Sequence, residues 1–231
     1  KATPQQPGGS FLIDVAHFRG DDLLADLTDR DFTLNAIAVD LLGDLSQIID
    51  PLNGEQDLTA RIIRQCAPTA ISSDPLRGLR ALRQSTQLNA RIEPETLQAV
   101  RAADLAGVSA ERVRDELFKV LATNTPPKPL RLVGALGLMD GVMPEIPAMK
   151  ATPCDIAGVE TIWDLALRTV EKMRGMLDTI SAKRTDSTAA RFELGMIVMT
   201  MDPYRKALQA HISARWPNER SHSELLILAA L

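Results

Sequence analysis

The spacing of apolar residues changes near residue 57, and this change limits the folds that the chain can adopt. Before it, short β-branched and partly alternating runs predict strands at Phe11–Phe18, Thr33–Leu41 and Gln47–Ile49. A turn and a short helical piece are expected at Gly20–Thr28, and the Pro- and Gly-rich Lys1–Ser10 is expected to be a loop. After it, the apolar residues follow the period of amphipathic helices. Helices are expected at residues 55–61, 74–89, 93–104, 109–122, 128–137, 157–182, 187–200, 202–214 and 219–231.

These patterns predict a mainly α-helical protein with a small β part, divided into three segments. The three segments are residues 1–60, 61–124 and 125–231. Thr123–Pro129 is the clearest linker because it is rich in proline. The linker is short and is followed by Leu132, Leu136 and Leu138, so we expect the last segment to pack on the middle one as a single unit.

Composition excludes several classes of protein. The sequence has no run of eighteen uncharged apolar residues, so it predicts no membrane span. Only Cys66 and Cys154 are present, too few for a disulfide scaffold or a thiolate metal cage. The chain opens on Lys1 without a basic-then-apolar leader, which gives secretion no support, and we interpret the chain as a fragment.

The net charge of −4 hides a gradient along the chain. Residues 1–60 hold three basic and eleven acidic side chains, a net charge of −8, whereas residues 61–131 hold twelve basic and seven acidic ones, a net charge of +5. An acidic segment followed by an arginine-rich one is typical of proteins that handle metal-bound polyphosphates or RNA. Solvated helix faces of either sign would give the same charges, so charge alone leaves both interpretations open.

The segment Asp74–Arg83 carries two stripes at helical spacing, one of leucine and one of arginine. The leucines are Leu76, Leu79 and Leu82, and the arginines are Arg77, Arg80 and Arg83. Asp74 or Ser73 ahead of Pro75 predicts the start of a helix, with a capping oxygen before a proline in the first turn. Arginines one turn apart repel one another, which favours an anion such as a triphosphate or an RNA backbone in front of them. Nearby carboxylates would serve as well, so the spacing does not decide between the two.

Five motifs occur in an order that resembles one known family. They are Arg30–Ala38 (RDFTLNAIA), Ile49–Gly54 (IDPLNG) with Asp57-Leu58, the pair Ile63-Arg64, the Asp-Pro-Leu-Arg run at Asp74, and Glu111–Leu117 (ERVRDEL). This order resembles the class II tRNA nucleotidyltransferases and bacterial poly(A) polymerases, among them the CCA-adding enzymes. The resemblance implies an incomplete nucleotidyltransferase (polymerase β-like) head at 1–60, a nucleotide-selecting helical neck at 61–124, and an α-helical body at 125–231 that binds RNA.

The same resemblance implies the reaction and its partners. Such an enzyme is cytoplasmic and adds C and A, or A alone, from CTP and ATP to the 3′ end of tRNA or another RNA, with no membrane partner. Mg²⁺ ions held by carboxylates would assist attack of the RNA 3′ hydroxyl on the α-phosphate. The neck motifs are shared by both branches of the family, so they do not distinguish CCA addition from poly(A) addition.

The resemblance also assigns nucleotide-binding residues. Asp74 would accept a hydrogen bond from the amino group of C or A, and Arg77 would donate to the neighbouring ring atom. G and U place an acceptor where C and A place the amino group, so Asp74 would face an oxygen. By similarity, Arg30, Arg80 and Arg83 would contact the phosphates or the sugar of the nucleotide. Asn35 belongs to the same set because it lies on the neighbouring predicted strand.

The catalytic carboxylates are the main departure from the family. The Gly-Gly phosphate loop and the Asp-x-Asp pair of the family are expected upstream of Lys1. Asp14, on the first predicted strand, matches the position of the third carboxylate and is the catalytic and metal-binding candidate, although a strand-edge acid without a role is the alternative. One carboxylate cannot hold two metal ions, so we expect the chain alone not to transfer nucleotides.

Two further departures concern the neck and the body. Ser73 stands where the family usually has Glu, and Thr28-Asp29 precede Arg30 where a basic residue is common. Leu165 stands where relatives with an HD metal domain have His, so no such metal site is expected. The alternative function is therefore a non-catalytic RNA-binding or structural remnant that keeps the neck.

Overall fold

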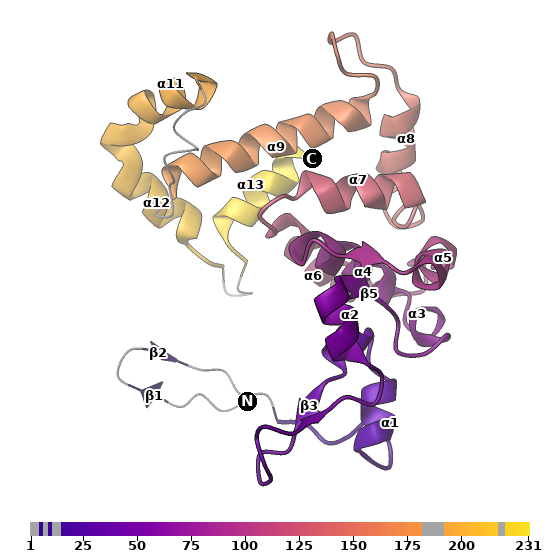
Figure 1. The fold of residues 1–231 in the computed structure, drawn as a ribbon. Helices are drawn as coiled ribbons and strands as arrows, with labels where there is room; N and C mark the ends of the chain where they lie inside the picture. The colour runs from indigo at the N-terminus through magenta and orange to yellow at the C-terminus, as the bar shows by residue number, and fades with distance from the viewer. Residues whose placement is uncertain (1–4, 7–8, 11–14, 182–191, 217–219) are drawn as a thin grey trace.

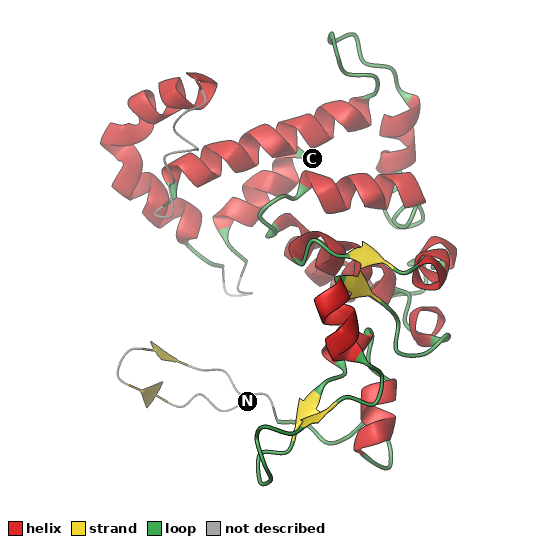
Figure 2. Ribbon diagram, in the orientation of Figure 1, coloured by secondary structure: helices red, strands yellow, loops and turns green. Residues whose placement is uncertain are grey.

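The computed structural model describes residues 5–6, 9–10, 15–181, 192–216 and 220–231. Its helices lead from α1 (Leu23–Thr28) at one end of the molecule to α9 (Ile162–Ile180) and α11 (Phe192–Met201) at the other (Figure 1). Helices dominate and the sheets are small (Figure 2). This confirms the predicted fold class.

Every described strand is two residues long. β1 (Gln5–Gln6) pairs antiparallel with β2 (Gly9–Ser10), β3 (Ala38–Val39) pairs antiparallel with β4 (Ile48–Ile49), and β5 (Ile62–Ile63) pairs parallel with β6 (Arg91–Ile92). The third predicted strand is therefore confirmed as β4. β1 and β2 stand where a loop was predicted, and the sequence did not predict β5 and β6.

Where the structure describes them, the two longer predicted strands are wrong except at β3. Phe11–Asp14 lie outside the described residues, and Val15–Phe18 form no strand. Thr33–Leu41 contributes only β3, because Thr33–Asn35 forms the 3-10 helix η1. The Asp31 carboxylate accepts hydrogen bonds from the backbone N–H of Phe32 and from the Asn35 amide, both at 2.9 Å. These local bonds replace the ladder that a strand would need.

Each of the nine predicted helices overlaps an observed one, and the core-facing stripe of leucines is buried as predicted. The helices after α1 are α2 (Gly54–Ala60), α3 (Ala70–Ser73), α4 (Leu76–Gln87), α5 (Pro94–Ala102), α6 (Ala110–Leu121), α7 (Pro127–Leu136), α8 (Glu145–Ala151), α9, α11, η2 (Asp202–Tyr204), α12 (Arg205–Ser213) and α13 (His222–Ala230). The short helices α3 and α8 were not predicted, and residues 187–191 of one prediction lie outside the described residues.

Two boundaries differ for clear reasons. The predicted linker Thr123–Pro129 is shorter, because α7 begins at Pro127 and includes Pro129 in its first turn, where a proline costs no backbone hydrogen bond. The helix predicted at 157–182 begins at Ile162, with Thr161 as the residue whose side chain caps it by accepting from the backbone N–H of Asp164.

One continuous apolar core joins the parts of the chain. It extends from Phe32 beside η1, through Leu79 and Leu82 of α4, to Leu167 of α9 and Ile227 of α13. The middle and last segments therefore pack as one unit, as the sequence predicted. None of the described helices is both long enough and apolar enough to cross a membrane.

Candidate functional site

A cavity of about 320 Å³ lies where the start of α4 meets the loop and turn around η1. Its lining contains Arg19, Arg30, Asp31, Asn35, Asp74, Arg77, Arg80 and Arg112. Five of the predicted site residues, Arg30, Asn35, Asp74, Arg77 and Arg80, thus come together from two separate stretches of sequence. Arg83 lies outside this lining, and Asp14 lies outside the described residues.

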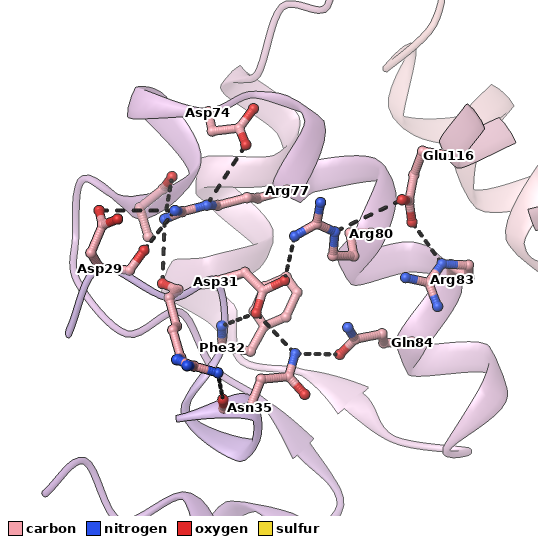
Figure 3. Close-up of polar contacts among 12 residues, drawn as sticks. Asp29, Asp31, Phe32, Asn35, Asp74, Arg77, Arg80, Arg83, Gln84 and Glu116 are labelled. Atoms are coloured by element: carbon pink, nitrogen blue, oxygen red, sulfur yellow. Dashed lines mark hydrogen bonds and ion pairs between the residues drawn. The ribbon is translucent and has the colours of Figure 1, made fainter. Parts of the chain in front are cut away.

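Arg77 is buried, and most of its N–H donors bond to backbone carbonyls (Figure 3). Its guanidinium donates to the carbonyl oxygens of Asp29 at 2.6 Å, Arg30 at 3.3 Å and Ala70 at 3.3 Å. Nε makes none of these bonds and lies 3.9 Å from Oδ2 of Asp74. Arg77 therefore joins α4 to the segment before η1, and it keeps one donor beside Asp74.

Neither Asp74 nor Ser73 caps α4 with its side chain, contrary to the prediction that one of them supplies a capping oxygen. The backbone N–H of Arg77 donates to the Asp74 carbonyl and that of Gly78 to the Pro75 carbonyl, each at 2.9 Å, so the first turn needs no side-chain acceptor. Oδ2 of Asp74 instead accepts from Arg112 of α6 at 2.7 Å. Oδ1 is buried and has no hydrogen-bond partner. An unpaired buried carboxylate oxygen is costly, so it marks a place where a donor is missing.

Arg80 is held by the buried carboxylate of Asp31. Its Nη1 donates to Oδ2 of Asp31 at 2.8 Å, while the Asn35 amide donates to Oδ1 at 2.9 Å and to Gln84 of α4 at 3.2 Å (Figure 3). Burial opposes the charge on Asp31, but these hydrogen bonds more than offset it and hold the pKa of Asp31 below its ordinary value. Asp31 is therefore a fixed anion that orients Arg80 and Asn35.

Arg30 and Arg19 form the rim of the cavity. Both Nε and Nη2 of Arg30 donate to Oδ2 of the buried Asp26, at 3.3 Å and 3.0 Å. The backbone N–H of Arg19 donates to Oδ1 of the same carboxylate at 3.0 Å. Hydrogen bonds from Arg30 and Arg19 hold the pKa of Asp26 below its ordinary value. One buried acid thus positions two arginine-bearing segments.

Arg83, one turn after Arg80 on α4, belongs to an ion-pair cluster around Glu116. Its Nε lies 2.7 Å from Oε1 of Glu116, a residue of α6 whose side chain is 1% exposed, and its Nη1 donates to Gln87 at 2.8 Å. Glu116 also pairs with Lys119 at 3.2 Å and lies 3.9 Å from Nε of Arg80. The predicted arginine stripe is therefore split between an open cavity and a filled ion-pair cluster.

Five charged residues of the site were not assigned roles from the sequence. Asp31, Arg112 and Glu116 lie inside the recognised motifs, so their motif membership was the available signal. Arg19 lies in none of the motifs. Asp26 lies in α1, also outside the motifs, and it can be recognised as part of the site only once its burial is known.

The described residues do not supply a metal site. No three His, Cys, Asp or Glu side chains in the described ranges are grouped so that they could hold an ion. Burial raises the pKa of Cys66, next to the cavity, to about 12, so its thiol stays protonated and is a poor ligand. We therefore assign no step of the chemistry to a metal ion on these residues.

Comparison with known proteins gives the family. A model of the Poly A polymerase head domain matches residues 12–64, and a model described as "Probable RNA and SrmB-binding site of polymerase A" matches residues 89–149. The A-adding tRNA nucleotidyltransferase of Deinococcus radiodurans is 44% identical over 128 residues, which are 52% of this chain and 29% of that protein. The CC-adding tRNA nucleotidyltransferase of Geobacter sulfurreducens is 43% identical over 116 residues, 49% of this chain and 26% of that protein. The chain belongs to the class II tRNA nucleotidyltransferase and poly(A) polymerase family.

A solved structure from this family has a similar fold. It is a tRNA nucleotidyltransferase complexed with a primer tRNA and an incoming ATP analog, with a TM-score of 0.54 and 25% identity, covering 74% of this chain and 45% of that one. The chain spans less than a third of the length of the two curated relatives. The cavity lies where the matched head region, which includes Arg30 and Asn35, meets the helices that follow it.

Proposed function

We propose that the cavity selects the incoming nucleotide of an RNA 3′-end nucleotidyltransferase, which adds C and A, or A alone, from CTP and ATP to tRNA or another RNA. The unpaired Oδ1 of Asp74 carries this proposal. Similarity to an A-adding and a CC-adding tRNA nucleotidyltransferase supports the choice of nucleotides and of tRNA.

The geometry of Asp74 and Arg77 suits the pairing edge of C or A. Oδ1 of Asp74 is an acceptor without a partner, and Nε of Arg77 is a donor close to the other oxygen of the same carboxylate. C and A both present an amino donor beside a ring-nitrogen acceptor, so each could bond to both groups at once. G and U present an acceptor first, which would leave Oδ1 unpaired and add repulsion. Three of the other four N–H donors of Arg77 are bound to carbonyls, and this proposal needs only its Nε.

Arg30, Arg80 and Asn35 are proposed to bind the phosphates and sugar. Arg30 and Arg80 line the cavity and are oriented by Asp26 and Asp31, so their guanidinium groups are already fixed toward it. For Arg83 we propose a supporting position through Glu116, since it does not line the cavity.

In the complete protein we propose Mg²⁺ as the metal and Asp14 as one of its carboxylates, with partners upstream. We also propose the division into a head at 1–60, a neck at 61–124 and an RNA-binding body at 125–231.

A non-catalytic RNA-binding or structural remnant is the second candidate. The observation that favours it is the commitment of Arg77 to three backbone carbonyls, a bonding pattern that holds the fold together without a ligand. Such a remnant would bind RNA but would not distinguish nucleotides.

Binding of the four nucleoside triphosphates to the 231-residue chain tests the proposal. We expect CTP and ATP to bind about tenfold or more tightly than GTP and UTP, the discrimination that a paired base edge supplies. Asp74→Ala should remove this preference. Asp74→Asn should weaken it, because an amide can donate to the oxygen of G or U. Asp155→Ala, an exposed acid away from the cavity, is the matched control and should keep it.

Isothermal calorimetry gives the affinities and thermal melts check folding. Equal affinity of all four nucleotides for the wild-type chain would contradict the proposal and favour the remnant. The full-length protein then separates the two candidates further, since only the enzyme incorporates radiolabelled CTP or ATP into a tRNA that lacks its 3′ end.

A further inference from the structure

Of the described residues that line the cavity beside Asp74, only Arg112 belongs to α6. Its Nη2 donates to Oδ2 of Asp74 at 2.7 Å, and about half of its side chain is exposed. The proposed contacts to base, sugar and phosphates do not use this guanidinium. Its bond to Asp74 therefore needs an explanation of its own.

Arg112 and Arg77 lie near the same carboxylate oxygen. Arg112 forms a short hydrogen bond to Oδ2 of Asp74, whereas Nε of Arg77 lies 3.9 Å from that atom, beyond hydrogen-bonding distance (Figure 3). Asp74 and Arg77 are three residues apart where α4 begins, so a small rotation of the carboxylate would close this gap into a local ion pair. Arg112 occupies the oxygen that such a pair would use.

A closed Asp74–Arg77 pair would remove groups that the proposed base contact needs. Nε is the donor of Arg77 assigned to the base, and three of its other N–H groups already bond to backbone carbonyls. If Nε bonded to Asp74, one donor and one acceptor would satisfy each other. The pairing edge of C or A would then have to displace a charge-assisted hydrogen bond before it could bind.

The position of α6 is fixed independently of this bond. Val113, the next residue after Arg112, is buried in the core together with Leu117. One turn further along, Oε1 of Glu116 lies 2.7 Å from Nε of Arg83 on α4. Arg112 therefore holds Oδ2 of Asp74 from a second helix, whose place does not depend on Arg77.

We propose that Arg112 is a positioning residue that keeps Asp74 and Arg77 from pairing with each other; this inference rests on the proposed function. Its bond to Oδ2 leaves Oδ1 of Asp74 and Nε of Arg77 without hydrogen-bond partners among the described residues. An acceptor and a donor held in this way are preorganised for a base edge that carries a donor beside an acceptor. Arg112 itself touches Asp74 and not the base.

Binding of the four nucleoside triphosphates to the 231-residue Arg112→Ala variant, measured by isothermal calorimetry, tests the proposal. We expect the affinity for CTP and ATP to fall about tenfold, because the base must now break the Asp74–Arg77 pair. GTP and UTP do not use the pair, so their affinity should change no more than about twofold, the effect of one exposed charge. The preference for CTP and ATP should therefore be lost.

Two further variants accompany Arg112→Ala. Arg112→Lys keeps the charge and one donor, so it should keep part of the preference. Arg114→Ala is the matched control, because it removes an exposed arginine of the same helix that does not line the cavity. It should bind all four nucleotides like the wild type, and thermal melts check that each variant is folded.

Two measurements separate positioning from a general effect on structure. In Asp74→Ala/Arg112→Ala the preference should equal that of Asp74→Ala alone, because Arg112 acts only through Asp74. The Nε–H signal of Arg77 in a proton–nitrogen NMR spectrum, assigned by its absence in Arg77→Lys, should move downfield in Arg112→Ala as Nε bonds to Asp74. A signal that does not move would overturn the proposal.

The nucleotide affinities decide between this proposal and the function on which it rests. The role of Arg112 is overturned if Arg112→Ala keeps the wild-type preference. It is also overturned if that variant weakens all four nucleotides alike, since Arg112 would then be a phosphate contact. In both cases the wild-type preference and its loss in Asp74→Ala would still support the proposed function. Equal affinity of all four nucleotides for the wild-type chain would overturn both.

Discussion

The cavity beside Asp74 and a groove between the end of α4, the start of α7 and the second half of α9 both carry basic residues, but they hold them differently. In the cavity each arginine is bound within the fold: Arg30 to Asp26, Arg80 to Asp31, and Arg112 to Asp74. In the groove Lys128 and Arg131 have no such partner in the described part of the chain. Both regions can attract anions, yet only the cavity fixes where its donors point.

This difference predicts different responses to substitution. A charge that is paired and buried contributes to folding and to the geometry of a ligand site, so its loss changes stability. An exposed, unpaired charge contributes to long-range attraction, so its loss changes salt-dependent affinity and leaves stability alone. The measurements below separate the two cases, beginning with the largest expected change.

The largest loss of stability is expected at Glu116. Its carboxylate is 1% exposed and pairs with Arg83 and Lys119, so Glu116→Ala leaves a largely buried guanidinium without its anion. Removing one partner of such a pair costs about 3–5 kcal/mol in the free energy of unfolding. Urea denaturation measures it, with the exposed Glu111 of the same helix as the control (Glu111→Ala, change below about 0.5 kcal/mol). Equal urea midpoints for the two variants would contradict a stabilising role for this cluster.

Arg77→Lys is expected to have the next largest effect. Lysine keeps the charge but cannot reach three carbonyls with one planar group, so charge-assisted hydrogen bonds are lost. We expect a loss of about 2 kcal/mol in the free energy of unfolding, measured by urea denaturation. Arg101→Lys, at an exposed position of α5, is the control. A variant as stable as that control would show that the carbonyl contacts contribute nothing.

A smaller effect is expected from the ionisation of Asp31. Because its pKa is lower in the folded chain than in the unfolded one, its contribution is fully present above about pH 4 and is lost as the pH falls through the folded pKa. Asp31→Asn lacks this contribution at every pH. The difference in unfolding free energy between wild type and Asp31→Asn should therefore shrink between about pH 7 and about pH 3. A difference that stays constant over this range would contradict the assigned direction of the shift.

The smallest change in stability is expected for Lys128→Ala/Arg131→Ala. The free energy of unfolding should stay within about 0.5 kcal/mol of wild type, because the two side chains have no partner to lose. Chemical denaturation of this variant beside Glu116→Ala tests the comparison directly. A loss approaching that of Glu116→Ala would show that the groove cations are structural.

The sequence predicted the helices well because their signal is local and repeated. The leucine stripe of α4 is buried as its spacing required, and each predicted helix overlaps an observed one. The strands were harder, because a two-residue strand such as β5 or β6 is too short to show an alternating pattern. Thr33–Asn35 has strand-like composition but turns, because the backbone N–H of Asn35 donates to the Phe32 carbonyl and the Asn35 side chain donates to Asp31.

Much of the site could be predicted as a set of residues, but not as a set of contacts. The motifs predicted that Arg30, Asp74 and Arg77 belong to one nucleotide-binding site. The pairing of Asp74 with Arg112 joins positions 38 apart in sequence, and no local pattern specifies it. The split of the arginine stripe likewise depends on Glu116, whose burial follows from the packing of α6 on α4.

Arg77 binds main-chain oxygens, which every residue type possesses. The side chains at positions 29, 30 and 70 can therefore change without removing these three acceptors. Asp29, which stands where the family often has a basic residue, is an example of such a change. We therefore expect the fold to tolerate substitutions at these positions, so divergence there is a weak guide to whether a relative keeps this contact between α4 and the segment before η1.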